Sequence, residues 1–165
     1  MTAQTSAAPM RPALVVEAYG KPAPQGSKER RGRAILESST RVRPWRSTVT
    51  DAAINARHAG GRCECSGPGH RFDVDTLDGP VVVEITLTVP KPASAPKTRV
   101  TWPTTRTSGD VDKHARAILD ALTDAGVWAD DARVVELTVR KVYPNEGIDA
   151  LPMPGALVRV YEVAA

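Results

Sequence analysis

Hydrophobic and polar positions along the chain predict several strands and two helices. Alternation or short apolar runs predict strands over 14–19, 34–36, 81–89, 135–143 and 156–163. Apolar residues spaced three or four apart predict one helix that begins at Pro44 and fades at Gly60, and a second that follows Asp110. Two segments, 20–33 and 91–109, are rich in Pro, Gly, Lys and Arg and lack a period, so we expect long loops there.

The second helix carries signals at both of its ends. Its apolar stripe is formed by Val111, Ala115, Ile118, Leu119, Leu122 and Gly126. Asp110 stands before the stripe, where its carboxylate can accept a hydrogen bond from a free amide of the first turn. Gly126 tolerates the left-handed conformation that ends many helices. In the next strand one face is formed by Val135, Leu137, Val139 and Tyr143, which predicts a half-buried strand.

The order of these elements predicts an α+β fold: a single domain with a mixed β-sheet and two main helices packed on one face. A length of 165 residues fits one domain. We place this domain at 12–165 and a disordered tail at 1–11. Trp45 falls on the apolar face of the first helix, so we expect it to anchor the core or an interface. Trp102 lies in a loop, where we expect partial burial.

Signals for a membrane or for secretion are absent from the sequence. No apolar run approaches the roughly 20 residues that a helix needs to span a bilayer. The first residues lack the basic region and following apolar region of a secretory signal. We therefore expect a cytoplasmic protein with no membrane partner.

The net charge is only +3, but opposite charges gather in two parts of the chain. Residues 1–46 hold nine Lys and Arg against three Glu, a balance of +6, whereas 110–131 holds six Asp against Lys113 and Arg116, a balance of −4. A basic surface beside an acidic pocket suits an enzyme that holds a polyanion; a solvated basic loop is the alternative. Lys28 does not follow a glycine as a phosphate-binding P-loop requires, so we expect no nucleotide cofactor.

The acidic segment suggests a metal site. Asp110 and Asp112 begin the second helix, and Asp130 and Asp131 precede the next strand. If the fold brings the two pairs together, their like charges raise one another's pKa, and a hard divalent cation such as Mg²⁺ or Mn²⁺ relieves the conflict. Such a cation activates water and stabilises charge on a phosphoryl oxygen. The alternative is that Asp110 is only a cap, that Asp112 pairs with Arg116, and that the second pair is a polar turn.

Two cysteines invite a comparison with zinc sites. Cys63 and Cys65 lie between His58 and His70, but one residue separates the cysteines where structural zinc sites have about two to four. A disulfide between residues two apart is geometrically poor. We therefore expect free thiols in a polar excursion rather than a zinc site.

The run GDVDKHARAILDALTDAGVWADDARVVELTVRKVYP, residues 109–144, resembles the core of the RusA family of Holliday-junction resolvases. That family carries a D-x-D-N-L-x-K segment, a helix that ends in D-A-L, a hydrophobic-W-x-D-D turn and a V-V strand. Asp110 and Asp112 fall on its first two catalytic aspartates and Asp131 on the third, with Asp130 the adjacent acid. The upstream segment PAPQGSKERR resembles one common near the start of RusA-like phage proteins.

The chain departs from the family pattern at three positions of the second helix. Lys113 and His114 replace the usual Asn-Leu, and Arg116 stands where the family has a functionally important lysine. Arginine keeps the positive charge and can grip phosphate in a fork, but it does not readily give up a proton. A role in clamping phosphate therefore survives the replacement, and a role in proton transfer does not.

The resemblance implies a homodimer that binds four-way DNA junctions and cuts two strands with Mg²⁺ or Mn²⁺, in a bacterial or phage-infected cell. It implies that Asp110, Asp112 and Asp131 hold the metal, with Asp130 close by. Arg116 would then support the charge that develops on phosphate during hydrolysis. We expect DNA contacts from basic side chains of the two loops: Lys28, Arg30, Arg31, Arg33, Lys91, Lys97, Arg99 and Arg106.

Two alternatives come from other classes of protein. The altered D-V-D-K-H-A-R motif is compatible with a catalytically weak DNA-structure-binding accessory protein of a phage or prophage. A D-x-D pair also suits a metal-dependent glycosyl- or nucleotidyltransferase, but no nucleotide-binding loop is recognisable.

Overall fold

The computed structural model describes residues 11–26, 28–31, 34–37, 40–60 and 76–163, and for 28–31 and 34–37 it describes the backbone. The strands of this part of the chain are β1 (Leu14–Tyr19), β2 (Lys28–Arg31), β3 (Ala34–Glu37), β4 (Val81–Thr88), β5 (Val134–Val142) and β6 (Gly155–Glu162). The helices are α1 (Val42–Gly60) and α2 (Val111–Asp124), with short 3₁₀ helices η1 (Arg106–Ser108) and η2 (Asp131–Arg133).

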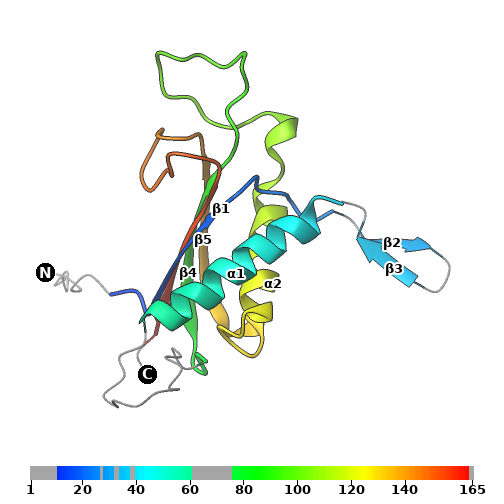
Figure 1. The fold of residues 1–165 in the computed structure, drawn as a ribbon, viewed down its shortest axis with the longest axis vertical. Helices are drawn as coiled ribbons and strands as arrows, with labels where there is room; N and C mark the ends of the chain where they lie inside the picture. The colour runs from blue at the N-terminus through cyan, green and yellow to red at the C-terminus, as the bar shows by residue number, and fades with distance from the viewer. Residues whose placement is uncertain (1–10, 27, 32–33, 38–39, 61–75, 164–165) are drawn as a thin grey trace, which may run out of the picture.

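Four of the strands form one mixed sheet. Its order is β1-β6-β4-β5, with β4 and β5 parallel and the other neighbours antiparallel. Both helices lie on the same side of this sheet, and α1 crosses α2 (Figure 1). The predicted α+β fold, with a mixed sheet and helices on one face, is confirmed. β2 and β3 form a separate hairpin that projects from the body of the molecule (Figure 1).

The prediction of a loop over 20–33 is wrong near its end, where β2 forms. This strand pairs antiparallel with β3, from Lys28 opposite Glu37 to Arg31 opposite Ala34. All residues of β2 are charged, so no apolar alternation marks the strand in the sequence. Backbone pairing with β3 defines it instead.

The core lies between the sheet and the two helices. β1 and β4 point alternate side chains inward, and Val16, Val83 and Ile85 are at most 1% exposed. From α1, Trp45 and Val49 join the same cluster. The buried face of α2 is formed by His114, Ala115, Ala117, Ile118, Ala121 and Leu122. Trp45 is 2% exposed, which confirms its predicted role as a core anchor.

The end of α2 follows its predicted signal. Gly126 has a φ of 71°, in the left-handed region. Its amide donates to the Thr123 carbonyl at 2.9 Å, and the Val127 amide donates to the Leu122 carbonyl at 3.0 Å. These two bonds form a Schellman motif, which pairs carbonyls that the helix leaves free.

The start of α1 differs from the prediction. The helix begins at Val42, and Pro44 lies within its first turn, where the missing amide hydrogen leaves no helical bond unmade. α1 is tied to α2 by Arg46, whose guanidinium lies 3.2 Å from Asp120 Oδ2 and 2.5 Å from Asp124 Oδ2. In the described part of the chain, no helix is long and apolar enough to cross a bilayer.

β5 is an edge strand, and part of the face that was predicted to be buried is exposed. Val135 is 63% exposed and Leu137 is 39% exposed, although the alternation predicts burial. β6 inserts between β1 and β4, so β5 has no described neighbour on its outer side. Val139 is partly buried and Tyr143 is buried, so the far end of the strand agrees with the prediction. We call Val135 and Leu137 the exposed β5 patch.

Candidate active site

A tight turn leads from η1 into α2. Gly109 has a φ of 74°, a conformation that side chains rarely adopt. A Cβ atom at this position would lie 2.7 Å from His114 Nε2 and 2.8 Å from Pro24 Cγ. Glycine is therefore required here both by the backbone and by the close approach of two neighbours.

Two side chains hold this turn from opposite elements. His114 Nε2 lies 2.9 Å from the Ser108 carbonyl oxygen and donates to it, because a carbonyl only accepts. Lys141, near the end of β5, donates to Ser108 Oγ at 3.0 Å and to the Gly109 carbonyl at 2.5 Å. The carbonyls that immediately precede Asp110 are thus fixed by α2 on one side and by β5 on the other. We call His114 and Lys141 the clasp.

Burial sets the charge of the clasp. Burial lowers the pKa of His114, which is 1% exposed, and the charge of Lys141 lowers it further, while the bond to Ser108 opposes the shift. The imidazole is therefore neutral near pH 7, and its Nδ1 is buried without a hydrogen-bond partner. Burial also lowers the pKa of Lys141, and the charge of Asp110 opposes this effect.

Asp110 and Asp112 project from the end of α2 that the clasp holds. Asp110 occupies the N-cap position, but its carboxylate makes no capping bond, contrary to prediction. Its Oδ2 lies 2.8 Å from Lys113 Nζ instead, and this hydrogen bond lowers the pKa of Asp110. Asp112 and Arg116 are both exposed, and no ion pair joins these two described residues. The predicted alternative of an Asp112–Arg116 pair is therefore wrong.

Asp130 and Asp131 lie at the opposite end of α2. The helix has 14 residues, which is about 21 Å at about 1.5 Å per residue. Figure 1 shows α2 running from the 91–109 loop to the turn at its far end, from which β5 returns. Asp130 Oδ1 accepts the Ala132 amide at 2.8 Å and caps η2, while Asp131 is exposed. One chain therefore keeps the two acidic pairs apart.

This separation decides how a metal fits. Carboxylate oxygens suit Mg²⁺ or Mn²⁺. Among the residues that the structure describes, however, no group of three or more His, Cys, Asp or Glu side chains could hold a metal ion. A single chain therefore offers Asp110 with Asp112 at one place and Asp130 with Asp131 at another, and does not assemble the predicted ligand set.

The other predicted site residues fall in three groups. Lys97, Arg99 and Arg106 are exposed on the loop before α2, and Trp102 beside them is 65% exposed, so the expected partial burial of Trp102 is wrong. The basic residues of the hairpin are on β2, where the backbone is described: Lys28, Arg30 and Arg31. The remaining predicted positions lie outside the described residues: Arg33, Cys63, Cys65 and His70.

The contribution of Lys141 was not predicted from the sequence. A signal was present, because strand alternation places Lys141 on the same face as Val139. In the sheet Lys141 is opposite Leu87, whose side chain is fully buried. A lysine on the inward face of a strand needs polar partners, and here they are Ser108 and Gly109.

The family model described as "Endodeoxyribonuclease RusA" matches residues 20–149. This range contains the clasp, the turn at Gly109 and both acidic pairs. Among curated proteins, no match was found.

Proposed function

The chain belongs to the RusA endodeoxyribonuclease family, and we propose that it acts as a homodimeric, Mg²⁺-dependent nuclease that resolves four-way DNA junctions in recombination and repair. Family membership implies Holliday-junction resolvase activity, which is hydrolysis of phosphodiester bonds. RusA nucleases depend in general on divalent metals. The dimer, the preference for Mg²⁺ over Mn²⁺ and the roles of individual residues are our proposals.

The observation that carries the proposal is the clasped turn. His114 and Lys141 fix the two carbonyls before Asp110, and the chain then presents Asp110 and Asp112 to solvent. Positions fixed in this way favour catalysis, because a catalytic group must already be aligned when substrate arrives. The carboxylates also follow directly on a loop that carries Lys97, Arg99 and Arg106, as a site for a polyanion requires.

The separation of the acidic pairs supports a homodimer. Soluble dimers are most often two-fold symmetric, so the same patch on both chains meets itself. If two exposed β5 patches meet with opposite strand directions, the start of α2 in one chain comes to the end of α2 in the other. The partner's Asp131 and Asp130 then stand near Asp110 and Asp112. Two chains would complete two sites, which suits two coordinated cuts.

The residues of the chain take these roles in the proposed reaction. A bound divalent cation supplies an activated water and neutralises charge on a phosphoryl oxygen. Asp110, Asp112 and Asp131 would hold that cation, and Asp110 would then exchange its bond with Lys113 for the metal. Arg116 is exposed on the same helix, where its fork can hold a non-bridging phosphate oxygen. We assign Arg116 no proton transfer, because an arginine side chain does not readily give up a proton.

Cleavage of synthetic four-way, flap and linear duplex DNA, with and without Mg²⁺, tests the activity. We expect cleavage of the four-way junction that requires the metal. Cleavage of flaps alone would indicate a general structure-specific nuclease. Binding without cleavage would favour the accessory protein, which the Asp110–Lys113 pair and the divided acids also fit.

Mixing two inactive variants tests the dimer. If sites are shared, Asp112→Asn and Asp131→Asn chains together form one intact site per mixed dimer, and cleavage returns to about half within the mixed population. If each chain carries its own site, the mixture stays inactive. Light scattering that finds only monomer, with junction cleavage intact, would contradict the dimer.

A further inference from the structure

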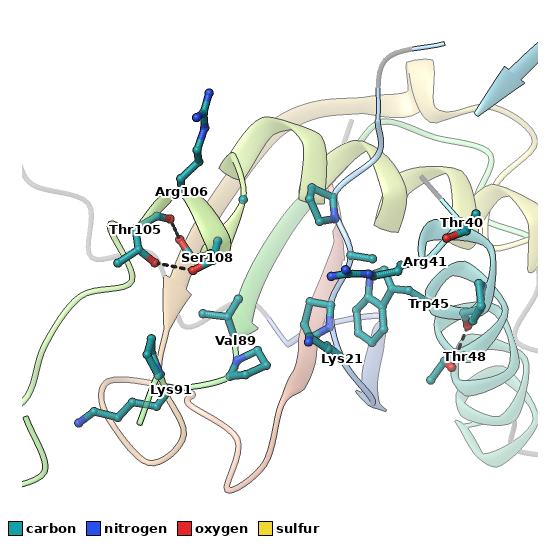
Figure 2. A pocket seen from close by; sticks show the side chains of 18 residues that line it. Lys21, Thr40, Arg41, Trp45, Thr48, Val89, Lys91, Thr105, Arg106 and Ser108 are labelled. Carbon is teal, nitrogen blue, oxygen red and sulfur yellow. Dashed lines mark hydrogen bonds between the residues drawn. The ribbon is translucent and has the colours of Figure 1, made fainter. Parts of the chain in front are cut away.

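A basic cavity lies beside the start of α2. Its volume is about 900 Å³, and it opens between the segment after β1, the start of α1, the end of β4 and η1. Figure 2 shows Arg41 and Trp45 on one wall and Thr105, Arg106 and Ser108 on another. Gly109 forms part of the lining and directly precedes Asp110. The cavity therefore adjoins the candidate active site.

The lining carries positive charge, most of which is not neutralised within the described part of the chain. Its cations are Lys21, Arg41, Lys91 and Arg106, and none of the described residues that line it is acidic. Lys91 is paired with Glu146 outside the cavity. Lys21, Arg41 and Arg106 form no ion pair in the described part of the chain. In Figure 2 the Arg106 side chain extends outward from the rim, so Lys21 and Arg41 supply the charge of the interior.

The rest of the lining suits a sugar–phosphate backbone better than a base. Hydroxyl groups come from four threonines and one serine, and the walls are stiffened by prolines: Pro22, Pro24, Pro44, Pro90 and Pro92. Trp45 is 2% exposed, so its ring is not available as a stacking platform. Cavities of about 300–1,000 Å³ hold compact ligands, so this one has room for part of a single strand and not for a duplex.

We infer that this cavity binds the sugar–phosphate backbone of one unpaired DNA strand next to the phosphate that is cut, with Lys21 and Arg41 as its phosphate contacts. The inference rests on the proposed nuclease function, and it adds the part of the junction that the site selects. Strands leave the duplex where the arms of a junction meet. A cavity that admits a single strand favours such points over continuous duplex, without reading the sequence.

A matched pair of double variants tests the inference. Lys21→Ala with Arg41→Ala removes two exposed cations from the cavity. Arg11→Ala with Arg43→Ala removes two exposed cations that do not line it. Binding of a short fluorescein-labelled oligothymidine strand, and of a duplex, is measured in EDTA across a salt series. We expect the cavity variant alone to bind the strand about tenfold more weakly, with a salt slope smaller by about 1.4.

Several results would overturn the inference. Equal losses of strand affinity in both double variants would mean that only the overall charge of the protein matters. Equal losses of affinity for strand and duplex would mean that the cavity does not select a single strand. Displacement of the strand by inorganic phosphate at constant ionic strength would leave a site for a free anion only. Junction cleavage by the unchanged protein is measured in parallel. If the unchanged protein cleaves junctions but the cavity variant binds the strand as well as the unchanged protein does, the inference about the cavity is wrong and the proposed nuclease function stands. If the cavity variant loses strand binding but the unchanged protein cleaves no junction, the proposed nuclease function is wrong and the cavity still binds a single strand.

Discussion

The two ends of α2 each carry an acidic pair, but they are built in different ways. At the start, Asp110 follows a turn held by Lys141 from β5, and the Lys113 carbonyl accepts the Gln25 amide at 3.1 Å. These partners are distant in the sequence. At the other end, the bonds made by Asp130 itself are local, such as the cap that it gives η2. Long-range bonds there reach the neighbouring residues instead: Arg57 donates to the Ala125 carbonyl, the Leu77 amide donates to the Val127 carbonyl, and Arg133 pairs with Asp78.

The start of α2 is therefore more preformed than the turn that carries Asp130 and Asp131. A turn fixed by several elements opens only when the packing around it opens, whereas a turn closed by local bonds opens alone at lower cost. The start of α2 is thus a rigid platform for Asp110 and Asp112. Asp131 is exposed on a local turn, where a partner chain can reach it. Substitutions at the two ends should therefore have different consequences.

Removal of the carboxylate charges is expected to have the largest effect. Asp110→Asn, Asp112→Asn and Asp131→Asn should each reduce junction cleavage to background. Junction binding without metal should be kept or tightened, because each change removes a negative charge that faces phosphate. Cleavage and gel-shift assays on one labelled junction measure both, with Asp51→Asn on the exposed face of α1 as the control. Normal cleavage by Asp131→Asn alone would restrict the site to one end of α2.

Loss of the clasp should come next. Lys141→Met leaves the Gly109 carbonyl without its partner, which should cost about 1–3 kcal/mol of unfolding free energy. We expect kcat to fall about 10- to 100-fold, as when groups that orient metal ligands are removed, with KM and metal-free junction binding little changed. Lys141→Arg should recover part of kcat, and neighbouring Arg140→Ala should behave as wild type. Equal losses of kcat and binding would make Lys141 merely structural.

Two glycines separate stability from activity. Gly109→Ala should lower unfolding free energy by about 1–3 kcal/mol and impair cleavage, because the new Cβ meets His114 and Pro24. Gly126→Ala should cost about 1 kcal/mol and leave cleavage nearly unchanged, since its Cβ meets the flexible end of Arg57. Thermal unfolding and cleavage rates measure this, with Gly79→Ala, which has open space around it, as the neutral control. Intact cleavage by Gly109→Ala would mean that the turn does not position Asp110.

The smallest effect concerns pH. Because burial lowers the pKa of His114, the unfolded chain takes up a proton more readily than the folded chain below the ordinary value of 6.5. The contribution of neutral His114 to the free energy of unfolding is therefore complete above pH 6.5. It is lost as the pH falls toward the lower pKa of His114 in the folded protein, by at most about 1.4 kcal/mol per pH unit. The test compares wild type with His114→Leu, and both proteins keep Lys141 and Asp110, the charged groups that face the ring. Denaturant unfolding should show a flatter pH dependence for His114→Leu than for wild type; equal slopes would contradict it.

Much of the fold could be predicted because local patterns determine it. β1 and β4 match their apolar alternation, and Gly126 ends α2 where its backbone freedom is needed. β2 could not be predicted, because four charged residues become a strand only through pairing with β3. The exposure of Val135 and Leu137 also follows from topology, since β6 inserts next to β4 and leaves β5 at the edge.

The candidate site was predicted in its parts and not in its assembly. Asp110 and Asp112 lie at the start of α2, as the capping pattern indicates. Their distance from Asp131 follows from the parallel pairing of β4 with β5: a crossover helix starts at the edge where one strand ends and finishes where the next begins. The periodicity of either strand does not predict that pairing. Prediction of the clasp would have required the strand register, which places Lys141 opposite Leu87.

The exposed β5 patch also bears on solubility. An open edge strand presents unpaired amide and carbonyl groups, and other chains can add to it as further strands. Between Val135 and Leu137 stands Glu136, whose exposed charge is of the kind that discourages such growth. If the proposed dimer covers this edge, dissociation of the dimer should make the protein prone to aggregation. Replacing Glu136 with a neutral residue should lower the concentration at which precipitation begins.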